Sequence, residues 1–228
     1  MNNRIILPMD NMPWLASLEL MKYTQGKVWG YKIRRQIFEK GIDFLKIAKA
    51  YGNIMVDLKF YDIPSAMTEA IKFFELADII TVHCNAMYIP QDNGIDKLST
   101  KLAGVTILTS MNDGDVNMIY RNSIKNQIDL FASFAEHHDY GYIVCSAADL
   151  VDLKNTGIKK ICPGIRPSWY QDKNDDQNRT MTPVEAVKAG ADLLVIGRPI
   201  LKAKDIIKAL DMTNHEMLKL EMKLKGLL

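Results

Sequence analysis

The sequence predicts an α/β fold, a single-domain (β/α)8 TIM barrel in which eight parallel strands alternate with helices. Eight short apolar runs recur along the 228 residues. Most of these runs are continuously apolar, as expected for parallel strands that are covered on both faces. The longer segments between many of them carry apolar residues at helical spacing. Such an alternation is typical of a closed barrel, and a doubly wound open sheet is the alternative that the pattern leaves open.

The strand candidates are short and most are continuously apolar. In chain order they are residues 4–9, 27–33, 53–59, 78–83, 104–109, 141–146, 159–164 and 192–197.

The helix candidates follow from apolar spacing and from start and stop signals. Leu15, Leu18 and Met21 share one face of the first candidate, a proline at position 64 suits a first helical turn, and Gly190 is a stop signal. The last candidate is either one helix or two. In order, the candidates are residues 12–23, 34–51, 64–77, 116–138, 182–191 and 203–228. No linker, repeat or low-complexity segment divides the chain, so residues 1–228 are expected to form one domain.

Composition excludes several classes of partner. Hydrophobic residues make up 48% and charged residues 25% of the chain, and the net charge is only +2. This balance gives no reason to expect a nucleic-acid partner. No apolar run reaches the length of a membrane span, and no signal peptide is visible, so a cytoplasmic protein is expected. The three cysteines, Cys84, Cys145 and Cys162, are expected to be buried reduced thiols rather than metal ligands.

Charged residues gather at the ends of the first three strand candidates. Asp57 and Lys59 are two residues apart and should face the same side of a strand. Asp10 ends the first strand candidate, Lys32 lies near the end of the second, and Asp62 follows the third. An ordinary ion pair at a strand end, with Asp62 capping the next helix, is one interpretation. In a barrel, however, these groups would converge on the mouth where reactive groups collect, which indicates a charged reaction site.

A second set of residues follows the last two strand candidates, where barrels of this kind usually bind phosphate. Gly197 lets an anion approach the backbone, and Arg198 offers a forked cation. Arg166 follows the seventh strand candidate, and the polar segment 168–179 separates it from the eighth. Taken alone, these segments are also compatible with an ordinary turn and a solvated loop.

Five motifs together resemble the orotidine 5′-monophosphate (OMP) decarboxylase family, in the family's order and at compatible spacing. They are DLKFYDIPS (57–65), LTSM (108–111), CPGIRP (162–167), DQNRTMTP (176–183) and VIGRPI (195–200). The resemblance implies conversion of OMP to UMP and CO2 in pyrimidine biosynthesis, with no metal and no organic cofactor. It implies that Lys59 delivers a proton to C6, that Asp57 lies against the substrate carboxylate, that Lys32 bridges the acids, and that Asp10 contacts a ribose hydroxyl.

The resemblance also assigns the remaining site residues. Thr109 and Ser110 would read the pyrimidine edge. The phosphate would be bound by Arg166, Gly197 and Arg198, and by Gln177 when a mobile loop around 167–180 closes. The family forms homodimers in which the residues equivalent to Asp62 and Ile63 reach into the partner's site, so a homodimer is expected.

Some features depart from the family or leave alternatives open. Arg34 stands where the family usually has a small residue, which puts the geometry around Lys32 in question. His83 either lines the mouth or is a packed structural histidine. Rival functions are a related sugar-phosphate lyase that needs Mg²⁺, such as 3-hexulose-6-phosphate synthase or keto-gulonate-phosphate decarboxylase, and a catalytically silent nucleotide-binding barrel.

Overall fold

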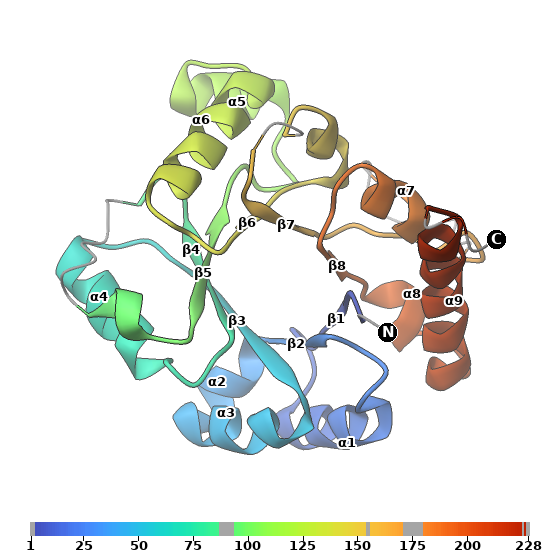
Figure 1. Ribbon diagram of the computed structural model, residues 1–228. Helices are drawn as coiled ribbons and strands as arrows, with labels where there is room; N and C mark the ends of the chain where they lie inside the picture. The colour runs from blue at the N-terminus through green and yellow to red at the C-terminus, as the bar shows by residue number, and fades with distance from the viewer. Residues whose placement is uncertain (1–2, 87–93, 154–155, 171–179, 225, 227–228) are drawn as a thin grey trace.

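The computed structural model describes residues 3–86, 94–153, 156–170, 180–224 and 226. Within them eight parallel strands pair in chain order, and β1 (Ile5–Pro8) also pairs with β8 (Leu193–Val195), so the sheet closes (Figure 1). The helices surround the sheet on its outer side (Figure 1). This closure confirms the (β/α)8 barrel and excludes the open sheet.

The strands occupy the predicted positions, with one displacement. The fifth strand is predicted at 104–109 but comprises Lys101–Val105. It begins at the exposed Lys101, and the chain leaves the barrel after Val105. Thr109 and Ser110 therefore lie in the loop that follows. The strands between β1 and β8 are β2 (Gly30–Ile33), β3 (Asn53–Phe60), β4 (Ile79–His83), β5 (Lys101–Val105), β6 (Tyr142–Val144) and β7 (Lys159–Cys162).

Two predicted helical segments are divided in the structure. The segment 34–51 breaks at Gly41, whose φ is 58°, and 116–138 breaks at Arg121, whose φ is 55°. The segment 203–228 contains one long helix within its described part. The helices are α1 (Trp14–Thr24), α2 (Arg35–Lys40), α3 (Ile42–Ala48), α4 (Pro64–Phe73), α5 (Asp113–Tyr120), α6 (Ile124–His137), α7 (Pro183–Lys188), α8 (Arg198–Leu201) and α9 (Ile206–Leu224), with 3-10 segments η1 (Lys49–Tyr51), η3 (Ile95–Lys97) and η4 (Ala147–Val151).

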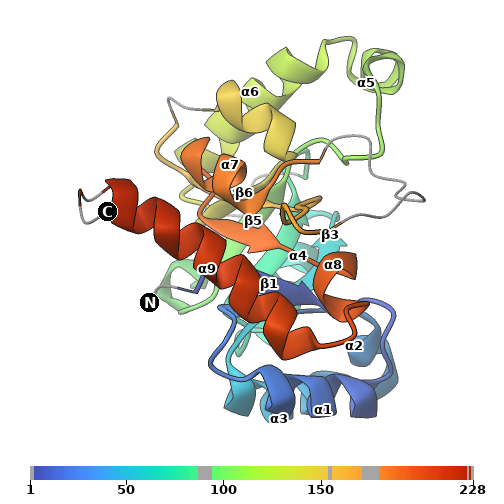
Figure 2. The ribbon, with the colours of Figure 1, turned by 90° about the vertical axis from the view of Figure 1, so that its right-hand side faces the viewer.

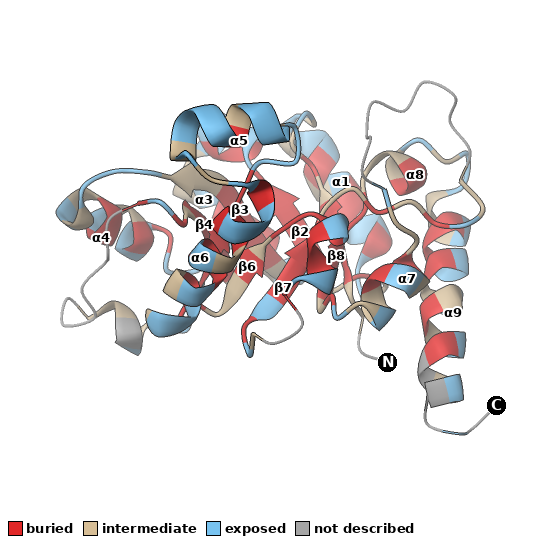
Figure 3. Ribbon diagram, turned by 90° about the horizontal axis from the view of Figure 1, so that it is seen from above, coloured by how far each residue is buried: buried red, intermediate tan, exposed pale blue. Residues whose placement is uncertain are grey.

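The hydrophobic core has two layers, because successive strand residues point to opposite faces. Ile6 lies inside the barrel with Met55, while Ile5 and Leu7 pack toward the surrounding helices. The strands are accordingly mostly buried (Figure 3). All three cysteines are buried and free, as the sequence predicted.

The last helix packs on the outside of the barrel. α9 runs along α7 and α8 (Figure 2). Among the described residues, no helix is both long enough and apolar enough to span a membrane.

Candidate active site at the mouth of the barrel

Four of the predicted charged residues form one continuous array. The Lys32 ammonium lies 2.5 and 2.6 Å from the two carboxylate oxygens of Asp10 and 2.8 Å from Asp57 Oδ2. The Lys59 ammonium lies 2.7 Å from Asp57 Oδ1. The array therefore alternates in charge from Asp10 through Lys32 and Asp57 to Lys59.

Neighbouring strands bring these residues together. Lys32 pairs in register with Pro8 on β1, which places the Asp10 segment beside it, and β3 pairs with the other side of β2. Lys59 is less regular, because the pairing of β3 with β4 shifts between Val56 and Phe60 and its φ is 50°. A non-glycine residue in this left-handed region costs about 1–3 kcal/mol, and such strain is frequent at functional sites.

The two buried members of the array, Asp57 and Lys32, remain charged at neutral pH. Burial opposes the charge of Asp57, but the ammonium groups of Lys32 and Lys59 outweigh it and hold the pKa of Asp57 well below its usual range. Burial likewise opposes the charge of Lys32, yet Asp57 and Asp10 raise its pKa above the ordinary value. Opposite charges thus keep both of these buried groups ionised.

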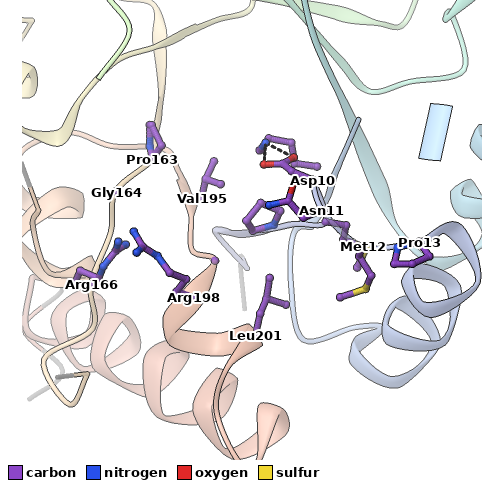
Figure 4. A pocket seen from close by; sticks show the side chains of 14 residues that line it. Asp10, Asn11, Met12, Pro13, Pro163, Gly164, Arg166, Val195, Arg198 and Leu201 are labelled. Carbon is purple, nitrogen blue, oxygen red and sulfur yellow. Dashed lines mark hydrogen bonds and ion pairs between the residues drawn. The ribbon is translucent and has the colours of Figure 1, made fainter. Parts of the chain in front are cut away.

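A cavity of about 600 Å³ opens beside the array. Asp10 and Lys32 line one part of it, and Gly197, Arg198 and Arg166 line another. The guanidinium groups of Arg166 and Arg198 reach toward one another from the loop after β7 and the start of α8 (Figure 4). Two converging arginines provide the forked donors that suit a phosphate or a carboxylate.

A smaller cavity of about 190 Å³ adjoins the first. Asp57, Lys59 and Thr109 contribute polar groups to it, and the rest of its wall is largely apolar. Lys32 lines both cavities, as do Pro163 and Val195, so the two form one composite site. The other residues of the smaller wall are Met55, Val105, Ile107, Leu108, Val144 and Cys145.

Other predicted site residues lie outside this arrangement. Asp62 is exposed, and its Oδ1 accepts a hydrogen bond from the N–H of Ile63, which is itself exposed at the start of α4. Ser110 is exposed and lines neither cavity. Gln177 lies outside the described residues, so its predicted phosphate contact stays a prediction.

The region around Lys32 accommodates Arg34 without distortion of the array. Arg34 precedes α2 with a φ of −148°, outside the region that favours glycine. Its N–H donates to Gln36 Oε1 at 3.1 Å, while Gln36 Nε2 lies 2.7–2.8 Å from the carbonyls of Met9 and Met12 and from Ser17 Oγ. Gln36 is fully buried and ties the segment around Asp10 to the start of α2. Sequence reasoning missed it, because a glutamine in a first helical turn is unremarkable.

His83 is placed beside the site rather than in its wall. Burial and the nearby Lys59 ammonium, opposed by Asp57, lower its pKa, so the imidazole is neutral near pH 7. Its ring meets the edge of Tyr61 at a centroid distance of 5.9 Å and lines neither cavity. Over the described ranges, no group of three or more histidine, cysteine, aspartate or glutamate side chains is placed to hold a metal ion.

Comparisons with known proteins agree with this geometry. Residues 3–213 match the orotidine 5′-phosphate decarboxylase / HUMPS family. The orotidine 5′-phosphate decarboxylase of Saccharophagus degradans is 35% identical over 94% of each chain, and that of Ehrlichia canis is 34% identical over 92% of this chain and 95% of its own. The crystal structure of the Lactobacillus acidophilus orotidine 5′-phosphate decarboxylase superposes with a TM-score of 0.78 at 26% identity, covering 95% of this chain and 99% of that one.

The fold and the composite site define a (β/α)8-barrel enzyme with a charged mouth open to an anionic ligand. The family match extends over most of the chain, and its relatives are similar along nearly their whole length. The chain belongs to the orotidine 5′-phosphate decarboxylase / HUMPS family.

Proposed function

We propose that this enzyme is an orotidine 5′-phosphate decarboxylase, a carboxy-lyase that converts OMP to UMP and CO2. The observation that carries the proposal is the Asp10–Lys32–Asp57–Lys59 array, which lies between an arginine-lined cavity and a smaller apolar one. OMP has the matching parts in order: a phosphate, a ribose and a flat ring that carries a carboxylate. The names of the curated relatives support the same substrate.

The two cavities suggest how OMP is oriented. The phosphate is bound by Arg166 and Arg198, with Gly197 allowing close approach to the backbone. The ribose lies over Asp10 and Lys32, and the pyrimidine ring enters the smaller cavity. There Thr109 contacts the ring edge, with Ser110 in the adjoining loop.

In this orientation the ring carboxylate lies beside Asp57 and Lys59. The C6–carboxylate bond breaks, CO2 leaves, and the electron pair remains at C6. The Lys59 ammonium stabilises the developing carbanion and then transfers its proton to C6, after which Lys59 recovers a proton from water. Asp57 opposes the substrate carboxylate and holds Lys59 in place, while Lys32 bridges the two acids. Preorganised charge accounts for the larger share of catalysis, since the reaction uses no cofactor in this proposal.

The test is the loss of OMP absorbance with purified, folded Lys59→Ala. We expect no measurable decarboxylation above background, whereas wild-type protein converts OMP to UMP. A Lys59→Ala enzyme that works at nearly the wild-type rate rejects the assignment of Lys59.

A related sugar-phosphate lyase is the second candidate, because the matching family description spans both groups. Such lyases use Mg²⁺ with additional acidic ligands, so a chelator separates the two functions. We expect EDTA to leave OMP decarboxylation intact. A silent nucleotide-binding protein would bind UMP without consuming OMP.

Two further features complete the proposal. A homodimer would place Asp62 and Ile63 of one subunit at the partner's site, consistent with their exposure at the start of α4. The segment around 167–180 would close over the phosphate and bring Gln177 to it, so Gln177→Ala should raise KM for OMP. A cytoplasmic location stays a prediction.

A further inference from the structure

Thr81 is a buried threonine on β4 that contacts both members of the Asp57–Lys59 pair. Its side chain is fully buried, and its hydroxyl lies 3.0 Å from Asp57 Oδ1. The same oxygen accepts a hydrogen bond from the backbone N–H of Lys59 at 2.9 Å. A hydroxyl donates once and also accepts, so one side chain serves both neighbours. The carbonyl of Val56, at 3.5 Å, is a more distant alternative acceptor for the hydroxyl proton.

The position of Thr81 coincides with the irregularity in the barrel. Val56 pairs with Ile80 and Phe60 pairs with Val82, so four steps along β3 correspond to two along β4. Thr81 is the β4 residue inside this gap. The hydroxyl of Thr81 takes the place of a backbone acceptor for the N–H of Lys59, a group that needs a partner when it is buried.

This irregularity is a bulge in β3, and it sets the direction of Lys59. With a φ of 50°, Lys59 leaves the regular strand, and its ammonium comes back to Asp57 Oδ1 at 2.7 Å. Both the backbone and the carboxylate partner of Lys59 are therefore held by one hydroxyl group.

We propose that Thr81 is a positioning residue for the proposed decarboxylation, whose hydroxyl fixes the bulge of β3 and thereby holds the Lys59 ammonium at Asp57. The kinetic consequence rests on the proposed function. The structural consequence does not, because it concerns only the conformation of Lys59.

Three variants separate this role from ordinary core packing. Thr81→Val keeps the shape of the side chain and removes the hydroxyl, while Thr81→Ser keeps the hydroxyl. Thr213→Val is the matched control, because Thr213 is also fully buried and its hydroxyl donates to the Ala209 carbonyl at 2.8 Å within α9, away from the mouth.

Steady-state kinetics with OMP give the first measurement. We expect Thr81→Val to lower kcat about tenfold to a hundredfold, with KM changed by less than about threefold, because misplacing a reacting group mainly affects the chemical step. Thr81→Ser should recover most of kcat, and Thr213→Val should lower Tm without lowering kcat. A Thr81→Val enzyme with wild-type kcat, or a serine variant as slow as the valine variant, overturns the proposal.

Crystal structures of the wild-type and Thr81→Val proteins give a measurement that does not depend on activity. We expect Lys59 to leave the left-handed region in Thr81→Val and its ammonium to separate from Asp57. An unchanged bulge and an unchanged Lys59–Asp57 contact overturn the proposal. If the wild-type protein fails to consume OMP, the proposed function fails, and this structural comparison alone decides the role of Thr81.

Discussion

The ammonium of Lys32 lies 2.8 Å from Asp57 Oδ2, and both side chains are about nine-tenths buried. Lys32 also contacts both oxygens of Asp10, so this one cation neutralises two acids on different strand ends. The contact joins the two cavities, since Lys32 lines both of them. Lys32 therefore stabilises the array and lies, with Pro163 and Val195, where the two parts of the site meet.

Replacement of Lys32 by methionine should be costly for both stability and activity. Asp57 and Asp10 would remain near one another without their shared cation, and breaking a buried ion pair by removing one partner costs about 3–5 kcal/mol. We expect a loss near the lower figure, since Asp10 is partly exposed, together with loss of OMP turnover. Urea unfolding and the absorbance assay measure the two effects.

The matched control for this variant is Lys27→Met, which breaks the exposed Lys27–Asp211 ion pair. Exposed pairs contribute less than about 1 kcal/mol, so this change should leave both stability and turnover nearly unaffected. Equal losses in the two lysine variants would contradict the special role of Lys32.

Acid should destabilise the protein partly through Asp57. Its pKa in the folded state lies well below the ordinary value of 3.8, chiefly because Lys32 and Lys59 overcome the effect of burial. Below about pH 4, Asp57 binds a proton in the unfolded chain but stays ionised in the folded chain. The free energy of unfolding therefore falls as pH falls, by at most about 1.4 kcal/mol per pH unit. We expect the free energy of unfolding, measured with urea between about pH 6 and pH 2.5, to fall less steeply with falling pH in Asp57→Asn than in wild type.

The comparison variant for the acid limb is Asp211→Asn, which alters a carboxylate in an exposed pair. Because exposed pairs contribute less than about 1 kcal/mol, this change should alter the free energy of unfolding only slightly over the same pH range. If Asp57→Asn gives the wild-type slope as well, Asp57 has no depressed pKa in the folded protein.

Gln36→Leu should impair binding of OMP through the segment that carries Asp10. The substitution leaves the carbonyl of Met12 without its amide donor, while the carbonyl of Met9 keeps only the N–H of Met12, and an unsatisfied buried group costs about 1–3 kcal/mol. We expect a comparable fall in stability and a severalfold rise in KM for OMP. Gln127→Leu, which alters another buried glutamine on α6, should change stability without changing KM. An unchanged KM in Gln36→Leu would show that the Asp10 segment does not depend on this contact.

The sequence predicted the charged array because acids and lysines interrupt otherwise apolar strand ends, a pattern that is informative in a barrel. The prediction for Lys59 was incomplete. Simple alternation places Lys59 on the same face as Asp57, whereas the structure places it there through a bulge and a left-handed residue. No residue pattern in the third strand indicates such a bulge. Thr81 was not predicted for a related reason. Threonine is common in strands, and the role of Thr81 depends on that bulge.

The boundary of β5 shows another limit. Lys101 reads as a loop residue, but it begins the strand because the amino end of a barrel strand can be solvated while the following residues are buried. Long-range closure, rather than local apolar character, sets where this strand begins and ends. The positions of Thr109 and Ser110 in the following loop could not be obtained from the local pattern alone.

A shared active site across a homodimer makes a prediction about mixtures of inactive variants. If Asp62 serves the partner's site, Lys59→Ala and Asp62→Ala should each have little activity alone. A mixed dimer, however, contains one site with both changes and one site with neither. After subunit exchange, half of the dimers are mixed and half of their sites are intact, so activity should recover to about a quarter of the wild-type level.

Size-exclusion chromatography of differently tagged subunits measures how many mixed dimers form, and the absorbance assay measures turnover in the same sample. A mixture of Lys59→Ala with Lys32→Met is the control. Each of these changes damages the array of its own chain, so a mixed dimer of the two has no intact site. Mixed dimers of Lys59→Ala and Asp62→Ala without recovered turnover, or full activity of Asp62→Ala alone, would place Asp62 outside the partner's site. Recovery of turnover in the Asp62→Ala mixture, but not in the Lys32→Met mixture, assigns Asp62 to the opposite subunit. The intact site then combines Lys59 of one chain with Asp62 of the other.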